Sequence, residues 1–251
     1  MTVREKLAAG QKAAGTMLRL LRNPAGVVLA ADAGLDFVMF DCEHSCYSME
    51  TLHDMFVTCR LAGMEGFVRV PEGTKDWISR VLDQGALGVM VPMIETAEQA
   101  ENLVHYAKYQ PIGGRGYSSM VAHTLYRPGE HTKVMEDLNR RTTVIAQIET
   151  LPAVENCEAI AAVEGIDALL IGPNDLSLSL GIPGQLTHPD ELAAIARVAA
   201  ACKQAGKAFG MHAGGKLLEM FRDDVTLAMT GTDTDILAAG FRQLKETCGK
   251  L

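Results

Sequence analysis

The sequence predicts an α/β protein folded as a (β/α)8 TIM barrel. Eight short aliphatic runs recur along the chain, and most lead through a polar end into a helical pattern. The runs show little alternation of apolar and polar residues, which is typical of parallel strands buried on both faces. A length of 251 residues suits eight strand–helix units. No Pro/Ser-rich linker divides the chain, so we expect a single barrel domain over residues 1–251.

The strands and helices are predicted in order from these runs and from the segments between them. Apolar residues at i, i+3, i+4 and i+7 predict a helix over 52–59, which Gly63 would end. Thr96 and Gln99 form a capping-box pattern at the start of another helix. Further helices are predicted near 152–163, at 190–206 and at 234–248. The eight predicted strands are residues 16–20, 37–41, 66–70, 88–93, 143–149, 167–172, 207–211 and 225–231.

An open doubly wound sheet is the alternative architecture. Such a sheet usually has fewer units and carries a phosphate-binding loop. The sequence contains no GxGxxG or Walker pattern, and GGRG at 113–116 does not follow a strand-like run. The barrel is therefore the better interpretation.

Composition excludes several classes of function. The net charge of -8 argues against a nucleic-acid partner or an anionic membrane surface. No apolar stretch is long enough to span a bilayer, and the N-terminus has no apolar leader, so we expect a cytoplasmic protein. The six scattered cysteines are interpreted as reduced thiols.

Polar side chains gather at the carboxyl ends of the predicted strands, where barrel enzymes place their active sites. Glu149 and Asp175 end consecutive strands, and two neighbouring carboxylates favour a hard divalent cation such as Mg²⁺ or Mn²⁺. The alternative is that they cap the helices that follow. Gln147 lies two residues before Glu149 and shares its strand face, either at the site or in a polar layer of the barrel floor.

Two further groups have a functional and a structural interpretation. Arg69 lies within a predicted strand, where a buried cation needs an anion, which could be a substrate oxyanion or a neighbouring acid. His44 lies in FDCEHSC (40–46) and could be an acid–base group or a hydrogen-bonding partner at a helix start. The GPND turn at 172–175 could bind an anion or be an ordinary strand–helix turn. Cys42 and Cys46 lack a second Cys/His pair, which argues against zinc.

Several motifs together resemble the class II pyruvate aldolases of the HpcH/HpaI (hydroxy-ketoacid) type. The resemblance covers nearly the whole chain. It implies a (β/α)8 barrel, a homohexamer with exchanged C-terminal helices, and a divalent metal (Mg²⁺, Mn²⁺ or Co²⁺). It also implies reversible cleavage of a 4-hydroxy-2-oxo acid to pyruvate and an aldehyde. The motifs are DxEH (41–44), Arg69, VLDQGALGVMVPM (81–93), GGRG (113–116), QIET (147–150), GPNDLS (172–177) and GTDTDIL (231–237).

The resemblance also assigns a role to each matching position. Glu149 and Asp175 would bind the metal, and Gln147, Asn174 and Asp175 would contact the oxo acid. Arg69 would stabilise the enolate. His44 would be the catalytic base, and Asp83 would raise its basicity.

The expected chemistry agrees with the residues at the strand ends. Retro-aldol cleavage needs a base and an electron sink, which a metal can supply. A Schiff-base aldolase would instead need a lysine inside the barrel, and none lies at the carboxyl end of a predicted strand. Alternatives are a lyase using oxaloacetate or phosphoenolpyruvate, a citrate-synthase-like enzyme, or a catalytically silent barrel.

The chain departs from the family pattern at a few positions. Met17 or Leu18 stands where a tryptophan is common, Cys42 where glycine is common, and His123 where an arginine is expected. Arg19 lies beside the first of these, and we hypothesise that it favours an aldehyde carrying an acidic group.

Overall fold

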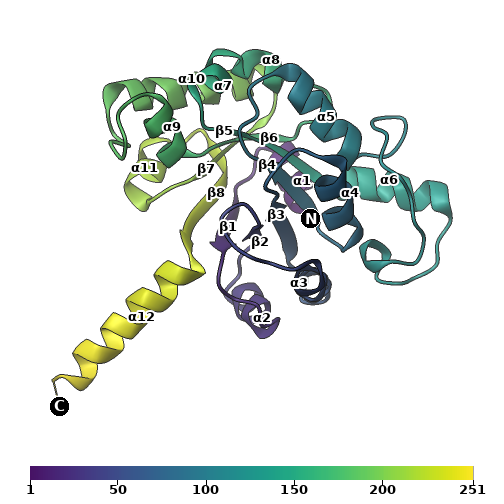
Figure 1. Ribbon diagram of the computed structural model, residues 1–251, viewed down its shortest axis with the longest axis horizontal. Helices are drawn as coiled ribbons and strands as arrows, with labels where there is room; N and C mark the ends of the chain where they lie inside the picture. Colours follow the sequence, from purple (N-terminus) through teal and green to yellow (C-terminus); the bar gives the residue numbers. More distant parts are fainter. Residues whose placement is uncertain (251) are drawn as a thin grey trace.

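The computed structural model describes residues 1–250 and forms a closed barrel of parallel strands in the order β1 to β8 (Figure 1). The predicted fold class is therefore confirmed. Every strand pairs in parallel with its sequence neighbours, and β1 closes the barrel against β8. The strands are β1 (Ala13–Leu18), β2 (Phe37–Asp41), β3 (Glu65–Arg69), β4 (Gly88–Val91), β5 (Thr143–Ile148), β6 (Ala168–Ile171), β7 (Ala208–His212) and β8 (Val225–Thr232).

The helices lie on the outside of the barrel, apart from α1 at its amino end and α12, which leaves it. Most have conventional starts: Thr96 and Thr232 form capping boxes, and Ser48 caps α3. Their bounds are α1 (Val3–Ala8), α2 (Ala25–Asp32), α3 (Met49–Leu61), α4 (Lys75–Asp83), α5 (Ala97–Ala107), η1 (Ala122–Thr124), α6 (His131–Arg141), α7 (Leu151–Glu155), α8 (Cys157–Ala161), α9 (Pro173–Ser179), α10 (Pro189–Ala205), α11 (Gly215–Met220) and α12 (Asp233–Cys248).

Strand β1 differs most from its prediction, because it begins three residues earlier than the predicted run at residue 16. Its first residues are alanine and glycine, which have low strand propensity and give little signal. Gly15 is needed there, because a Cβ at this position would come within 2.6 Å of the Phe37 ring on β2. Close packing of the barrel, and not local propensity, thus extends β1.

Two apolar clusters hold the barrel together. One fills its interior and includes Phe37 and Phe67, whose rings stack with centroids 4.8 Å apart. Val3 and Leu7 of α1 belong to the same cluster, so this short helix closes the amino end of the barrel. The other cluster lies between the strands and the outer helices. Helix α1 was not predicted, since six residues carry almost no periodic pattern.

Helix α12 extends away from the barrel toward the C-terminus (Figure 1). Its apolar side chains Ile236, Phe241 and Leu244 are each about 60% exposed or more. At its root, the buried Asp233 carboxylate accepts backbone N–H bonds from residues 19, 20 and 21 at 2.7–2.9 Å. The start of α12 is therefore tied to the turn after β1, although the rest of the helix leaves the barrel.

None of the helices within residues 1–250 combines the length and apolar character that crossing a membrane requires.

Candidate active site

All eight strands or the loops that follow them line one cavity of about 580 Å³ at the carboxyl end of the barrel. The loop after β2 contributes His44, and β3 contributes Arg69. Of the other predicted site residues, Gln147, Asn174 and Asp175 also line this cavity. Residues distant in sequence are brought together here because parallel strands end at one rim.

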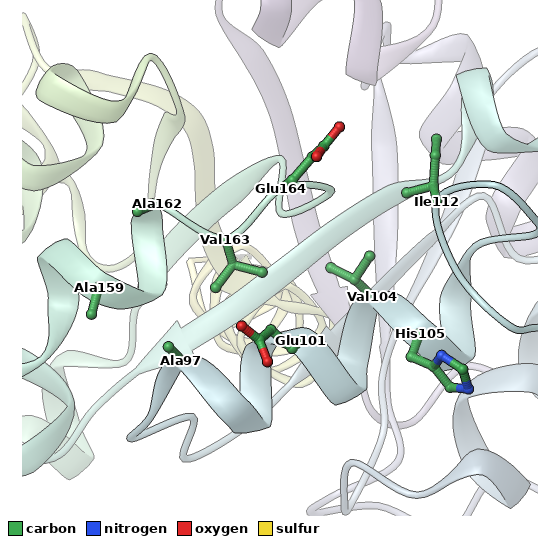
Figure 2. A pocket seen from close by; sticks show the side chains of 9 residues that line it. All are labelled: Ala97, Glu101, Val104, His105, Ile112, Ala159, Ala162, Val163 and Glu164. Carbon is green, nitrogen blue, oxygen red and sulfur yellow. The ribbon is translucent and has the colours of Figure 1, made fainter.

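A second hollow, of about 440 Å³, lies on the outer flank between α5 and α8 (Figure 2). Its titratable side chains are Glu101, His105 and Glu164, which point in different directions among small apolar residues. Across residues 1–250, no three His, Cys, Asp or Glu side chains are grouped to hold a metal ion. This flank therefore lacks the convergent polar groups found at the barrel mouth.

Arg69, which lines the cavity, forms a buried ion pair with Asp41. Arg69 donates to both carboxylate oxygens of Asp41, through Nε at 3.0 Å and Nη2 at 2.8 Å. Arg19 Nε adds a third bond to Asp41 Oδ2 at 2.8 Å. Burial favours the neutral acid, but the hydrogen bond and charge of Arg69, with smaller help from Arg19, lower the pKa of Asp41. The neighbouring-acid interpretation of Arg69 therefore holds within this chain.

The loop carrying His44 is held by the same aspartate. Asp41 Oδ1 accepts the backbone N–H groups of Glu43 at 3.1 Å and His44 at 3.2 Å. The His44 side chain is 54% exposed, and its Nε2 lies 3.8 Å from Glu43 Oε2. Since Ser48 caps α3, His44 does not serve as a helix-start partner. Its backbone is fixed while its imidazole faces the cavity.

Glu43 lies between His44 and the arginine. Its Oε2 is 3.0 Å from Arg69 Nη1 as an ion pair, but this oxygen lacks an aligned hydrogen bond from any described residue. Burial raises the pKa of the Glu43 carboxyl, which Arg69 and His44 partly offset. A buried, incompletely satisfied carboxylate oxygen at this rim is available to a water molecule or a cation.

Glu149 is held by neighbours on both oxygens. Its Oε1 accepts the Met93 backbone N–H at 2.9 Å, and its Oε2 accepts a short hydrogen bond from Gln147 Nε2. Burial, followed by the charges of Asp175 and Glu43, raises the pKa of Glu149 to about 7. Glu149 does not cap the next helix, because Thr150 does so.

The GPND turn brings the second carboxylate to Glu149. Gly172 allows this approach, since a Cβ there would lie 2.5 Å from Glu149 Oε2 and 2.7 Å from Gln147 Nε2. Asp175 follows in the first turn of α9, which has no side-chain cap. The helix-capping alternative therefore fails for Asp175 as well as for Glu149.

These donors fit a divalent cation. Glu149 and Asp175 are hard oxygen ligands, and the buried Gln147 Oε1 lacks a hydrogen-bond partner among the described residues. A bound cation would offset both causes of the raised pKa of Glu149, which are burial first and the neighbouring carboxylates second. Two protein carboxylates leave the remaining positions of a shell to water and substrate, as Mg²⁺ commonly requires.

Asp83 lies apart from the other predicted site residues. It ends α4, which leads into the amino end of β4, whereas His44 follows the carboxyl end of β2. The ion pairs recorded for Asp83 within residues 1–250 go to Arg115 at 2.6 Å and His123 at 3.5 Å. The structure thus brings together every predicted site residue except Asp83, whose effect on His44 stays a prediction.

Two residues that line the cavity were not predicted from the sequence: His212 at the end of β7 and Asp235 in the first turn of α12. His212 Nε2 lies 3.1 Å from the Gly231 carbonyl oxygen, and burial lowers the pKa of this imidazole. His212 directly follows the predicted strand 207–211, so its position at a strand end was a usable signal.

The comparisons with known proteins agree with this fold. The family model HpcH/HpaI aldolase/citrate lyase matches residues 17–238. A hydroxypyruvate/pyruvate aldolase of Roseobacter denitrificans is 31% identical and covers 96% of this chain and 97% of its own length. A 2-keto-3-deoxy-L-rhamnonate aldolase of Klebsiella pneumoniae is 37% identical over 74% of this chain and 69% of its own. The crystal structure of an HpcH/HpaI aldolase from Desulfitobacterium hafniense superimposes with a TM-score of 0.94 at 33% identity, covering 100% of this chain and 98% of that one.

Gly172→Ala should displace the Glu149 carboxylate, because the new Cβ would overlap it. We expect the affinity for Mn²⁺ in the presence of pyruvate to fall by about tenfold or more, measured by titration calorimetry. Gly215→Ala is the control, since Gly215 is exposed and its Cβ would meet nothing within 4 Å. Unchanged Mn²⁺ affinity in a folded Gly172→Ala protein would contradict this view of the site.

Proposed function

Because the chain belongs to the HpcH/HpaI aldolase/citrate lyase family, we propose that it is a class II pyruvate aldolase. The reaction is the reversible, divalent-metal-dependent cleavage of a 4-hydroxy-2-oxo acid to pyruvate and an aldehyde. The observation that carries the proposal is the convergence of Arg69, Gln147 and Asp175, with Glu149 behind them, on one cavity. Arg69 supplies a positive charge, and the other three residues supply hard oxygen donors, on the side where an oxo acid would bind.

The pyruvate half of the substrate is assigned to the Gln147 side of the cavity. Gln147 Oε1 is buried without a partner in the described chain, and Asn174 and Asp175 line the same wall. A divalent cation held by Glu149 and Asp175 would polarise the 2-oxo group and supply the electron sink. Arg69 is held by Asp41 and Glu43 and lines the cavity, where its positive charge would stabilise the enolate oxygen.

His44 is proposed as the base. It would take the proton from the 4-hydroxyl group, the C3–C4 bond would break, and the aldehyde would leave. The electron pair of that bond forms the pyruvate enolate beside Arg69, and C3 then takes up a proton. The Asp41 bond to the His44 backbone fixes the loop without occupying the imidazole, which leaves both ring nitrogens able to exchange a proton.

We also propose that the working site is built between copies of the chain. Asp83 and His44 lie at opposite ends of one barrel, so Asp83 can support His44 only in a neighbouring copy. Helix α12 presents Ile236, Phe241 and Leu244 to solvent, and a second copy would bury them. This supports the homohexamer with exchanged C-terminal helices that the resemblance implies.

Removing either proposed metal ligand should abolish metal-dependent cleavage. Glu149→Ala and Asp175→Ala are each expected to lower kcat/KM by at least about 100-fold, as chelation of wild-type protein should. Pyruvate release is measured with 4-hydroxy-2-oxo acids and, in parallel, with oxaloacetate. Asp223→Ala, which removes a carboxylate that is 91% exposed, is the control. Full activity after exhaustive chelation would exclude the metal assignment, and faster release from oxaloacetate would favour the alternative lyase.

Subunit complementation tests the roles of His44 and Asp83 together. His44→Ala and Asp83→Ala should each lower kcat by about 100-fold or more. If Asp83 serves a neighbouring copy, mixed oligomers regain up to about a quarter of wild-type activity, since that fraction of sites receives both intact residues. Activity is measured after the two variants are dissociated and reassembled together. Failure to regain activity in mixed oligomers of native size would refute the site between copies.

Arg19→Ala tests the hypothesis of an acidic aldehyde. Arg19 lines the cavity, and only its Nε is used by Asp41, so the rest of its guanidinium can face a substrate carboxylate. We expect the ratio of kcat/KM for a semialdehyde over a neutral aldehyde of equal length to fall by about tenfold. An unchanged ratio would reject Arg19 as a specificity residue without affecting the aldolase proposal.

A further inference from the structure

A cavity of about 310 Å³ lies at the other end of the barrel, away from the candidate active site. It is bounded by Arg60 in the last turn of α3, by η1 and the loop after it, and by one face of α6. Its lining on α6 is formed by residues 130, 133, 134, 137 and 138. None of its lining residues has a role in the proposed aldolase.

The charges of this cavity do not cancel. Glu130 pairs with Lys133 at 2.6 Å, and Asp137 pairs with Arg140 and Arg141. Arg60 and Arg127 remain, and neither has an ion pair with a carboxylate among residues 1–250. Burial, followed by the charge of Arg141, lowers the pKa of Arg60 to about 10, which leaves this guanidinium charged at neutral pH. Arg60 and Arg127 thus face a hollow whose own carboxylates are already paired with other cations, although the charge of Asp137 still acts on Arg60.

Buried polar atoms point to a missing partner. His123 is only 2% exposed and lines the cavity, yet neither ring nitrogen makes a hydrogen bond to a described residue. Its Nδ1 lies 3.5 Å from Asp83 Oδ1, an ion-pair distance that lacks hydrogen-bond alignment. Arg60 Nε is also buried and unpartnered in the described chain. Unsatisfied buried donors of this kind are rare in proteins and indicate a water molecule or a ligand.

The backbone adds donors on the same side. Helix α6 spans 11 residues and begins after Glu130 with no side-chain cap. The N–H groups of residues 131–133 have no partner among the described hydrogen bonds, and the helix dipole places partial positive charge there. Leu125 and Tyr126 both adopt left-handed backbone conformations, with φ of 50° and 58°, in the turn that brings Arg127 to the cavity.

We propose that this cavity binds a dianionic phosphoryl group, either free phosphate or the phosphate of a small ester. Arg60 and Arg127 would neutralise its charge, and the uncapped start of α6 would donate to its oxygens. His123 would provide a further donor from the buried side. The site is separate from the mouth of its own barrel, although His123 contacts Asp83, which we propose to serve a neighbouring copy.

Phosphate binding to the full-length oligomer tests this site. Inorganic phosphate is titrated by calorimetry in the presence of saturating pyruvate, which occupies the active site. Arg127→Gln should weaken binding by about tenfold or more, because it removes one of the two cations proposed to bind the phosphate. The variant should still fold, since the Arg127 side chain makes no described hydrogen bond. Arg60→Gln should weaken it similarly, although Arg60 also donates to the Ala122 and His123 carbonyls.

Lys203→Gln is the control, because Lys203 is exposed and lies in α10, outside the cavity. Glycerol 3-phosphate in place of phosphate separates the two sources: tighter binding of the ester, lost in Arg127→Gln, supports an esterified ligand, and tighter phosphate supports the free ion. The proposal is overturned if wild type shows no saturable phosphate binding, if Arg127→Gln binds as tightly as wild type, or if pyruvate competes with phosphate.

Discussion

The candidate site depends on one buried ion pair, between Asp41 at the end of β2 and Arg69 at the end of β3. Asp41 also receives Arg19 from the turn after β1 and the backbone of His44, so one carboxylate organises three neighbouring strand ends. Removing one partner of such a pair leaves an uncompensated buried charge, which costs about 3–5 kcal/mol. The fully buried aspartate therefore allows the Arg69 guanidinium to be buried at the end of β3.

Another part of the cavity brings together buried negative charges. Glu149 and Asp175, with Glu43 nearby, place negative charge where burial penalises it, and the raised pKa of Glu149 reflects this conflict. Glu43 links the two groups of charges, because its Oε2 lies 3.0 Å from Arg69 Nη1 while its charge helps to raise the pKa of Glu149. A substrate with a carboxylate and an oxo group suits this arrangement, because its oxygens would reach Arg69 and a cation held by Glu149 and Asp175.

The sequence predicts what short-range pattern and strand order determine. Buried parallel strands are continuous aliphatic runs, so β2 is predicted to the residue, and the rule that strand ends share one rim places Glu149, Asp175, Arg69 and His44 together. Side-chain partners across the barrel are not encoded in this way. The bond between Arg19 and Asp41, and the contacts of Asp83 with Arg115 and His123, depend on packing between distant segments. Motif spacing alone could not separate Asp83 from the barrel mouth.

The anchoring of Asp233 has a mechanical consequence. Its carboxylate accepts the backbone N–H of Arg19 at the root of α12, while the side chain of Arg19, which lines the cavity, donates to the buried Asp41. A change in the angle of α12 would therefore reach Asp41 through the backbone and side chain of Arg19. If the direction of α12 changes the position of Arg19, reciprocity requires that a ligand preferring one position of Arg19 also biases the direction of the helix. Arg19 therefore links helix α12 to the barrel mouth, through its backbone on one side and its side chain on the other.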